Sequence, residues 1–190
     1  RDWSVTGVQT CALPISLWKH WTAETPGPHV LAGHSMGGHL VLRTLAERQV
    51  DPAGGILSAP MLGFTASLLP DAVMHQAAKL MKALGDPRRP AWKWSEKPGE
   101  PPEARIHLLT HDAERYNDEI FWRQARPELV MGPGSWGWVE RAYASMRLLA
   151  TPGLLESIDT PVLILATDND KLVGYKAIAR AAERLRDVEL

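Results

Sequence analysis

Short apolar runs alternate with segments of helical spacing along most of the chain. The runs Val30–Ala32, Gly55–Leu57 and Pro161–Ala166 are apolar along their whole length, which is typical of buried strands. From Met36 onward the apolar residues follow a helical spacing, and "GYKAIARAAERL" repeats this after the third run. A further strand starts at Arg186–Leu190. Strands separated by helices predict an α/β fold with a parallel sheet that helices cover on both faces.

The segment between the second and third apolar runs, residues 65–150, contains helical patterns and no predicted strand. Asp71 is the predicted N-cap of a first helix, which ends at Gly85. "DAERYNDEIFWRQA" predicts a second helix, and Ser135 starts a third that ends before Thr151. The apolar faces are Val73, Ala77, Leu80, Met81 and Leu84 in the first helix and Trp138, Ala142, Met146 and Leu149 in the third. We therefore expect a helical cap, residues 65–150, inserted into a core of residues 17–64 and 151–190.

The first 16 residues fit no element of such a domain. The apolar positions of Val5–Ile15 follow neither period, and Gln9 and Thr10 interrupt the unbroken apolar run that a signal peptide needs. Back-translated, "VTGVQTCALPI" can be written as the codons of a sequencing-library adapter, which it resembles. We expect residues 1–16 to be non-native and "LWKHWTAE" to be the tail of a helix. We also expect the natural protein to begin upstream and to continue past Leu190.

Composition restricts the class of protein. With 190 residues, 45% hydrophobic and 23% charged, the chain suits one globular domain, and a net charge of −1 predicts no nucleic-acid partner. No apolar run approaches the roughly 18 residues that cross a bilayer, so we expect a cytoplasmic or membrane-peripheral protein. The single cysteine, Cys11, lies in the excluded stretch. No ligand cluster or phosphate loop supports a metal or nucleotide, so no cofactor is expected.

The stretch "GHSMGG", residues 33–38, carries the clearest chemical signal. It fits G-x-S-x-G between a strand and a helix, the pattern of a nucleophile elbow. Gly33 and Gly37 lack the Cβ atoms that would collide with the strand and helix, which leaves the Ser35 hydroxyl exposed as a nucleophile. The Met36 N–H, at the helix start, is predicted to face a developing oxyanion. His34 packs in the elbow or borders the pocket. The alternative is a glycine-rich turn with an incidental serine.

A serine nucleophile needs a base that an acid orients. Asp168 and Asp170 follow the third predicted strand, and either carboxylate could orient a histidine. In the order known for this motif the histidine comes last, yet all seven histidines precede Asp170. We expect the catalytic histidine beyond Leu190; the alternative is that one of the seven, which look structural or superficial, takes its place.

These segments together resemble α/β-hydrolases of the lysophospholipase and monoacylglycerol-lipase type, the serine aminopeptidase-like group. The resemblance rests on "LAGHSMGGHLVLRTLAE", "GGILSAPML", "LTHDAERYNDEIFWRQARPELVMGPGSWGWVERAYASM" and "IDTPVLILATDNDKLV". It implies that Ser35 is the nucleophile, that the Met36 N–H is one oxyanion donor, and that Asp170 rather than Asp168 is the acid. It also implies a second oxyanion donor in an upstream His-Gly loop, so the chain corresponds to the C-terminal part of the sheet.

The expected function is hydrolysis of lipophilic carboxylic esters, of the lysophospholipid or monoacylglycerol type, through an acyl-enzyme. Trp122, Trp136 and Trp138, with three methionines of the cap, could line an acyl site, or they could only pack the cap helices. Without its base, and with the strand edge at His29–Ala32 uncovered, the chain alone is expected to be nearly inactive and poorly soluble. The alternative function is a binding module that keeps the hydrolase shell and lacks the base.

Overall fold

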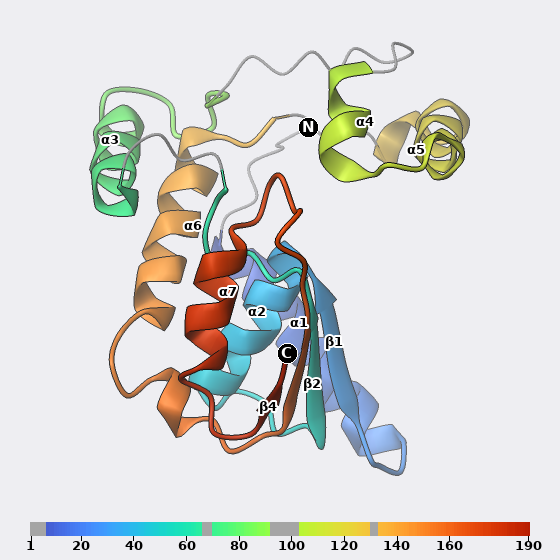
Figure 1. The fold of residues 1–190 in the computed structure, drawn as a ribbon, viewed down its shortest axis with the longest axis vertical. Helices are drawn as coiled ribbons and strands as arrows, with labels where there is room; N and C mark the ends of the chain where they lie inside the picture. Colours follow the sequence, from blue (N-terminus) through green and yellow to red (C-terminus); the bar gives the residue numbers. More distant parts are fainter. Residues whose placement is uncertain (1–6, 66–69, 92–102, 130–132) are drawn as a thin grey trace.

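The computed structural model describes residues 7–65, 70–91, 103–129 and 133–190, and its centre is a parallel four-stranded sheet (Figure 1). The strands are β1 (Val30–His34), β2 (Gly54–Ser58), β3 (Val162–Leu165) and β4 (Val188–Glu189), and they lie side by side in this order. The three apolar runs and the start at Arg186–Leu190 are therefore strands, which confirms the predicted parallel α/β sheet. Because all strands are parallel, the segments that follow β1, β2 and β3 leave the same edge of the sheet.

Helices account for the other regular elements described. They are α1 (Gly7–Glu24), α2 (Met36–Ala46), α3 (Asp71–Ala83), α4 (Glu103–Leu109), α5 (Ala113–Ala125), α6 (Trp136–Leu149) and α7 (Tyr175–Ala182), with 3-10 turns η1 (Pro127–Leu129) and η2 (Leu155–Ser157). None of the helices described is long and apolar enough to cross a membrane. Between β2 and β3 the described elements are helical, with α4 added to the three helices that the sequence predicts.

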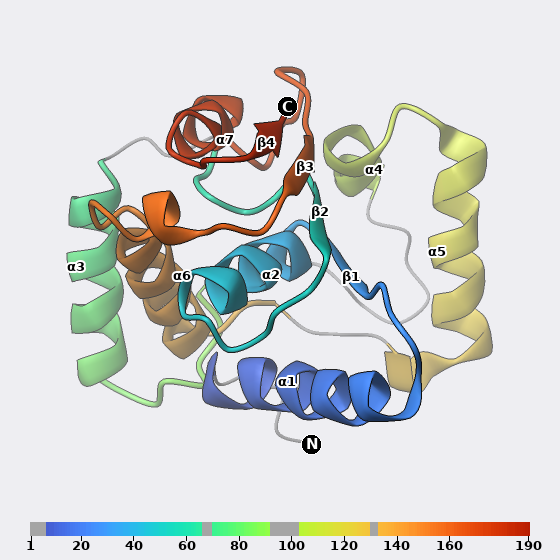
Figure 2. The same ribbon diagram turned by 90° about the horizontal axis from the view of Figure 1, so that it is seen from below.

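The core lies on one face of the sheet, where α2 and α7 pack (Figure 2). Leu57 of β2 and Ile164 of β3 point into it, and Leu42 and Ile178 reach it from the helices. Burial of these side chains supplies the hydrophobic free energy that holds the layers together. The other face is less covered by the described residues, because Val30 and Leu165 are exposed. Burial on both faces, which the apolar strands predict, is therefore not what the described residues show.

Helix α1 differs from the sequence prediction. It begins at Gly7, so the backbone of residues 7–15, which was expected to form no regular element, is helical. The C-terminal half of α1 is fixed to the chain that follows it: Trp18 is buried, and its ring and that of Trp21 both contact the ring of His29 just before β1.

Helix α3 exposes the face that was expected to be buried. Val73, Leu80 and Leu84 are exposed, and the buried residues are His75 and Ala78. The N-cap is Pro70, with Asp71 already in the first turn, so the predicted cap is one residue late. The reason for the inverted face lies in α6, against which α3 packs. Its Glu140 carboxylate is buried at this contact, and polar side chains of α3 approach it.

Helices α5 and α6 begin as capping chemistry dictates. The Asp112 carboxylate accepts hydrogen bonds from the N–H groups of Glu114 and Arg115, and the Ser135 hydroxyl accepts one from the N–H of Trp138. The third helix predicted between residues 65 and 150 is confirmed as α6, with Ala142, Met146 and Leu149 buried.

Candidate active site

Ser35 lies at the junction between β1 and α2, in a conformation that residues with side chains rarely adopt. Its φ is 49° and its ψ is −114°. Ser35 occupies the N-cap position of α2, but its side chain makes no capping hydrogen bond. The hydroxyl therefore accepts no hydrogen bond from the N–H groups at the start of α2, although a serine at the N-cap usually does.

Close backbone packing explains the first glycine of the motif. A Cβ on Gly33 would lie 2.4 Å from the carbonyl carbon of Gly37 and 2.6 Å from the nitrogen of Gly38. Gly37 behaves differently, since a Cβ there would meet nothing within 4 Å, so the collision predicted for it was wrong. The second tight position is Gly38, whose Cβ would lie 3.0 Å from the Gly33 oxygen and 3.1 Å from Cβ of Pro60. The strand therefore runs directly against the first turn of α2.

The backbone of Ser35 is held from two neighbouring segments. Its N–H donates to the carbonyl of Ser58, at the end of β2 (2.8 Å), and its carbonyl accepts from the N–H groups of His39 (3.1 Å) and Met61 (3.0 Å). The loop after β2 therefore contributes to the geometry of the elbow. Ala59 in this loop also has a positive φ, 41°. Two strained residues at one edge of the sheet are typical of a functional site.

Met36 is the first residue of α2. Its N–H is one of the donors at a helix start that have no acceptor within the helix, and it lies where the helix dipole favours negative charge. His34, on the other side of Ser35, is exposed and its Nδ1 lies 3.2 Å from the Ser58 hydroxyl. The elbow thus offers a backbone donor next to a serine hydroxyl, the arrangement that acyl transfer uses.

Asp170 lies in the loop that follows β3 and is oriented by the backbone. Its Oδ1 accepts hydrogen bonds of 2.8 Å from the N–H groups of both Leu172 and Val173. The loop is attached to the segment after β2, because the Thr65 hydroxyl donates to the Asp170 carbonyl and the Thr65 N–H to that of Leu172. With Oδ1 occupied, Oδ2 is the oxygen left to accept a proton donor from outside the loop.

Asp168, the other candidate acid, is exposed and has no hydrogen bond to the residues that the structure describes. Ser35 follows β1 and Asp170 follows β3, with β2 between the two strands. Because the strands are parallel and in register at His34, Ser58 and Leu165, both residues lie along the same edge of the sheet. The structure therefore brings the serine and an oriented carboxylate to one rim.

None of the seven histidines, all within the described ranges, hydrogen-bonds to Asp170. His20 and His29 pair with Glu24 and Thr25 near the end of α1, and His75 lies between α3 and α6. His39 is buried in α2, and burial, with a smaller effect of the Arg43 charge, lowers its pKa to about 4 against the opposing hydrogen bond to Met61. In the described parts of the chain, no group of three or more His, Cys, Asp and Glu residues could hold a metal ion.

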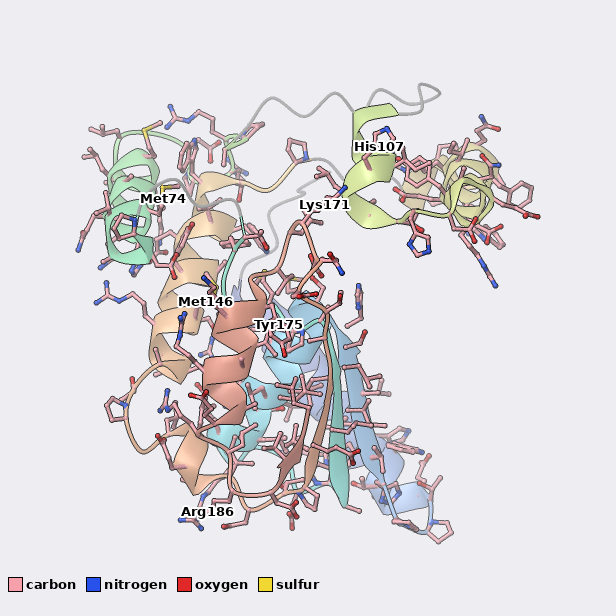
Figure 3. All side chains as sticks on the ribbon, in the orientation of Figure 1. Met74, His107, Met146, Lys171, Tyr175 and Arg186 are labelled. Atoms are coloured by element: carbon pink, nitrogen blue, oxygen red, sulfur yellow. The ribbon has the colours of Figure 1, made fainter. Side chains whose placement is uncertain are left out.

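The three tryptophans predicted to line an acyl site do not come together. Trp122 lies on α5, where its side chain is 55% exposed and packs edge-on against Phe121. Trp136 and Trp138 are half-buried on α6. Figures 1 and 2 both show α5 and α6 on opposite sides of the molecule. Of the methionines predicted to join them, Met146 of α6 is buried and Met74 of α3 is half-buried, on neighbouring helices (Figure 3).

Sequence reasoning missed two polar contacts near the site. Lys171, next to Asp170, donates from Nζ to the carbonyl of His107 in α4 (2.9 Å; Figure 3). The His39 ring bonds to the Met61 carbonyl and to the hydroxyl of Ser145 in α6. The sequence around Lys171 gives no sign of an acceptor 64 residues away. A histidine at a helix position that faces the core was, however, a usable signal, because buried polar side chains need partners.

The sequence of the chain is similar to that of known proteins. Residues 15–190 match the family described as serine aminopeptidase, S33. An uncharacterized abhydrolase domain-containing protein of Dictyostelium discoideum is 28% identical over 166 residues, which cover 86% of this chain and 16% of that protein.

Solved structures share the architecture. The monoacylglycerol lipase of Paleococcus ferrophilus superposes with a TM-score of 0.67 at 23% identity, over 96% of this chain and 62% of that one. A soluble variant of monoglyceride lipase from Saccharomyces cerevisiae, in complex with a substrate analog, gives 0.71 at 15% identity, over 98% and 60%. These likenesses show the α/β-hydrolase fold. The chain spans about three fifths of the length of these two structures.

Proposed function

Because this chain belongs to the serine aminopeptidase S33 family of α/β-hydrolases, we propose that it carries the nucleophile and acid of a serine hydrolase that cleaves lipophilic carboxylic esters. Ser35 is the nucleophile and Asp170 is the acid. The observation that carries the proposal is the strained Ser35, with a hydroxyl free of capping, on the same sheet edge as a carboxylate that two backbone N–H groups orient.

In the proposed reaction the Ser35 oxygen attacks the ester carbonyl and its proton passes to a histidine. Negative charge develops on the carbonyl oxygen, which the Met36 N–H at the start of α2 stabilises. The alcohol leaves with the proton from the histidine, and an acyl-enzyme remains on Ser35. Water then attacks the acyl group by the same route and releases the acid.

The histidine of this reaction must reach both the Ser35 hydroxyl and the free Oδ2 of Asp170. Since none of the seven histidines bonds to Asp170, we propose that the base comes from polypeptide outside this chain. The chain alone is then expected to show little turnover.

The substrate class rests on two kinds of support. The structural relatives are named as lipases and as a carboxyl esterase, the last from Bacillus coagulans. The cap, which we place at residues 65–150 between the two parts of the core, contributes apolar side chains such as Met74, Met146 and Trp136. We propose monoacylglycerol or lysophospholipid esters as substrates; peripheral contact with the membrane that holds them stays a prediction.

The test uses the complete gene product that contains this chain and a fluorophosphonate probe, which labels activated serines. Ser35→Ala should abolish labelling and hydrolysis of a monoacylglycerol, and Asp170→Asn should lower both by roughly a thousandfold or more. Asp168→Asn is the matched control and should leave both nearly unchanged. Labelling that survives Ser35→Ala would remove the proposal.

A binding module is the second candidate, because Asp170 has no histidine partner among the described residues. It predicts that the complete gene product binds monoacylglycerol without turnover and is not labelled by the probe. Labelling of Ser35 therefore separates the two functions.

A further inference from the structure

His39 is the most completely enclosed polar side chain near the elbow. It lies in the first half of α2 and is 2% exposed. Both ring nitrogens are engaged: Nδ1 lies 2.9 Å from the Met61 carbonyl oxygen and Nε2 lies 2.6 Å from the Ser145 hydroxyl. The ring therefore joins three separate segments, namely the elbow helix, the loop after β2 and cap helix α6.

The partners fix the direction of each hydrogen bond. A carbonyl oxygen can only accept, so Nδ1 carries the proton and donates to Met61. The ring is neutral, since burial lowers its pKa to about 4, and Nε2 therefore accepts from the Ser145 hydroxyl. That hydroxyl in turn accepts from Arg43 (3.0 Å). The result is a directed chain of donors that runs from Arg43 through Ser145 and His39 to the Met61 carbonyl.

Met61 connects this chain of hydrogen bonds to the nucleophile. Its N–H donates to the Ser35 carbonyl, which also accepts from the N–H of His39. The carbonyl of the strained residue is thus held by two donors, and the His39 side chain fixes the residue that supplies one of them. Backbone strain of this kind persists only when the surroundings determine the conformation.

We propose that His39 is a positioning residue for Ser35, holding Met61 against the Ser35 carbonyl and connecting the elbow to cap helix α6 through Ser145. The proposal rests on the proposed function, because it assigns a role in that reaction. His39 is enclosed by protein and touches no reacting atom. Its loss should therefore displace the nucleophile, which lowers kcat, and should change substrate binding little.

Two replacements of His39 distinguish the contributions of the two ring nitrogens. The side-chain amide of Asn lies near the position of Nδ1 and can donate to Met61, whereas that of Gln lies near Nε2 and can only replace the contact with Ser145. In the complete gene product, His39→Gln should lower kcat for a monoacylglycerol roughly tenfold or more, with KM within about threefold of wild type. His39→Asn should keep kcat within about threefold. Asn leaves the larger void, so a role in packing alone predicts the opposite order.

The rate of Ser35 labelling by a fluorophosphonate probe is measured in parallel with the melting temperature of each variant. Slower labelling in His39→Gln than in His39→Asn supports the proposal. Equal rates, or rates that follow only the loss of melting temperature, overturn it. If the wild-type gene product is neither labelled nor active, the proposed function fails first, and the positioning role fails with it.

A measurement on the unmutated protein covers the case in which the variants do not fold. Nitrogen-15 spectra of labelled histidine distinguish the two neutral tautomers of an imidazole ring. The proposal requires that His39 carry its proton on Nδ1 at pH 7. A proton on Nε2 would leave the Met61 carbonyl without this donor and would overturn the proposal.

Discussion

The elbow and the cap are held in place by different kinds of contact. Around Ser35 the backbone sets the geometry: Gly33 lies against the first turn of α2, and Ser35 bonds to Ser58 and Met61 through main-chain atoms. In the cap, side chains make the decisive contacts. Glu140 of α6, 6% exposed, accepts a hydrogen bond from Lys82 of α3, and Lys171 holds α4 through the carbonyl of His107.

This difference indicates how each region should respond to change. A Cβ added to Gly33 would lie 2.4 Å from the carbonyl carbon of Gly37, so substitution there should be strongly destabilising. Side-chain contacts can be removed one at a time, and the loss in free energy of unfolding depends on how deeply each contact is buried. The effects of substitution should therefore decrease from the elbow outward to the exposed edge of the cap.

Gly33→Ala should have the largest effect. The added Cβ meets backbone atoms of Gly37 and Gly38, which cannot rotate away, so the free energy of unfolding should fall by more than about 3 kcal/mol. Urea denaturation followed by circular dichroism measures it. Gly37→Ala is the control: its Cβ enters open space, and alanine favours the helix by up to about 1 kcal/mol. Equal losses in the two variants would contradict the close packing described for Gly33.

Acid should weaken the junction between elbow and cap through His39. The pKa of His39 is about 4 in the folded protein, below its ordinary value of 6.5, so the unfolded chain binds more protons between these values. The contribution of His39 to the free energy of unfolding is fully present above pH 6.5 and is lost as the pH falls toward 4. Between pH 7 and pH 5 the contribution amounts to roughly 2 kcal/mol of unfolding free energy.

The control for this prediction is His39→Asn, which has no group that titrates in this range. The free energy of unfolding is measured with urea for wild type and for His39→Asn. The difference between the two should shrink by the same amount from pH 7 to pH 5. A difference that stays constant with pH would show that His39 titrates near its ordinary pKa.

The packing of α3 on α6 should depend on Glu140 to an intermediate extent. Burial opposes the ionisation of this carboxyl, but the hydrogen bond and charge of Lys82 outweigh it, and the pKa is lowered. Glu140→Gln keeps the shape and removes the charge, so we expect a loss of about 1 kcal/mol in unfolding free energy. Asp118→Asn, an exposed carboxylate of α5, should change it by less than about 0.5 kcal/mol.

The core was predictable from sequence because its signals are local and redundant. The apolar runs that became β1, β2 and β3, and the glycines around Ser35, each indicate their structure without knowledge of a distant partner. The assignment of the second close contact failed, since Gly38 and not Gly37 lies against Pro60. That distinction depends on where the loop after β2 passes, which no local pattern contains.

The cap was predicted less well because the faces of its helices depend on one another. The apolar residues of α3 suggest a buried stripe, yet the helix turns His75 toward α6, where Glu140 Oε1 lies 3.6 Å from Nε2 of His75. A buried carboxylate requires polar neighbours. The free-energy cost of leaving it unpaired exceeds the gain that burial of Val73 and Leu80 would supply. Asp170 is an intermediate case. Its place after a strand was visible in the sequence, whereas the two N–H groups that orient it were not.

The smallest effect should come from Lys171→Met, which removes the contact between the loop after β3 and α4. Lys171 is exposed, so the global free energy of unfolding should change by less than about 0.5 kcal/mol. The local effect should be larger than the global one: amide hydrogen exchange in α4 should accelerate a few-fold, because the link to the His107 carbonyl limits opening of this helix. Lys176→Met removes an exposed lysine charge on α7 and should leave exchange in α4 unchanged. If both variants left α4 equally protected, the helix would be held by its apolar contacts. The contrast between elbow and cap would then rest on the side-chain contacts of α6 alone.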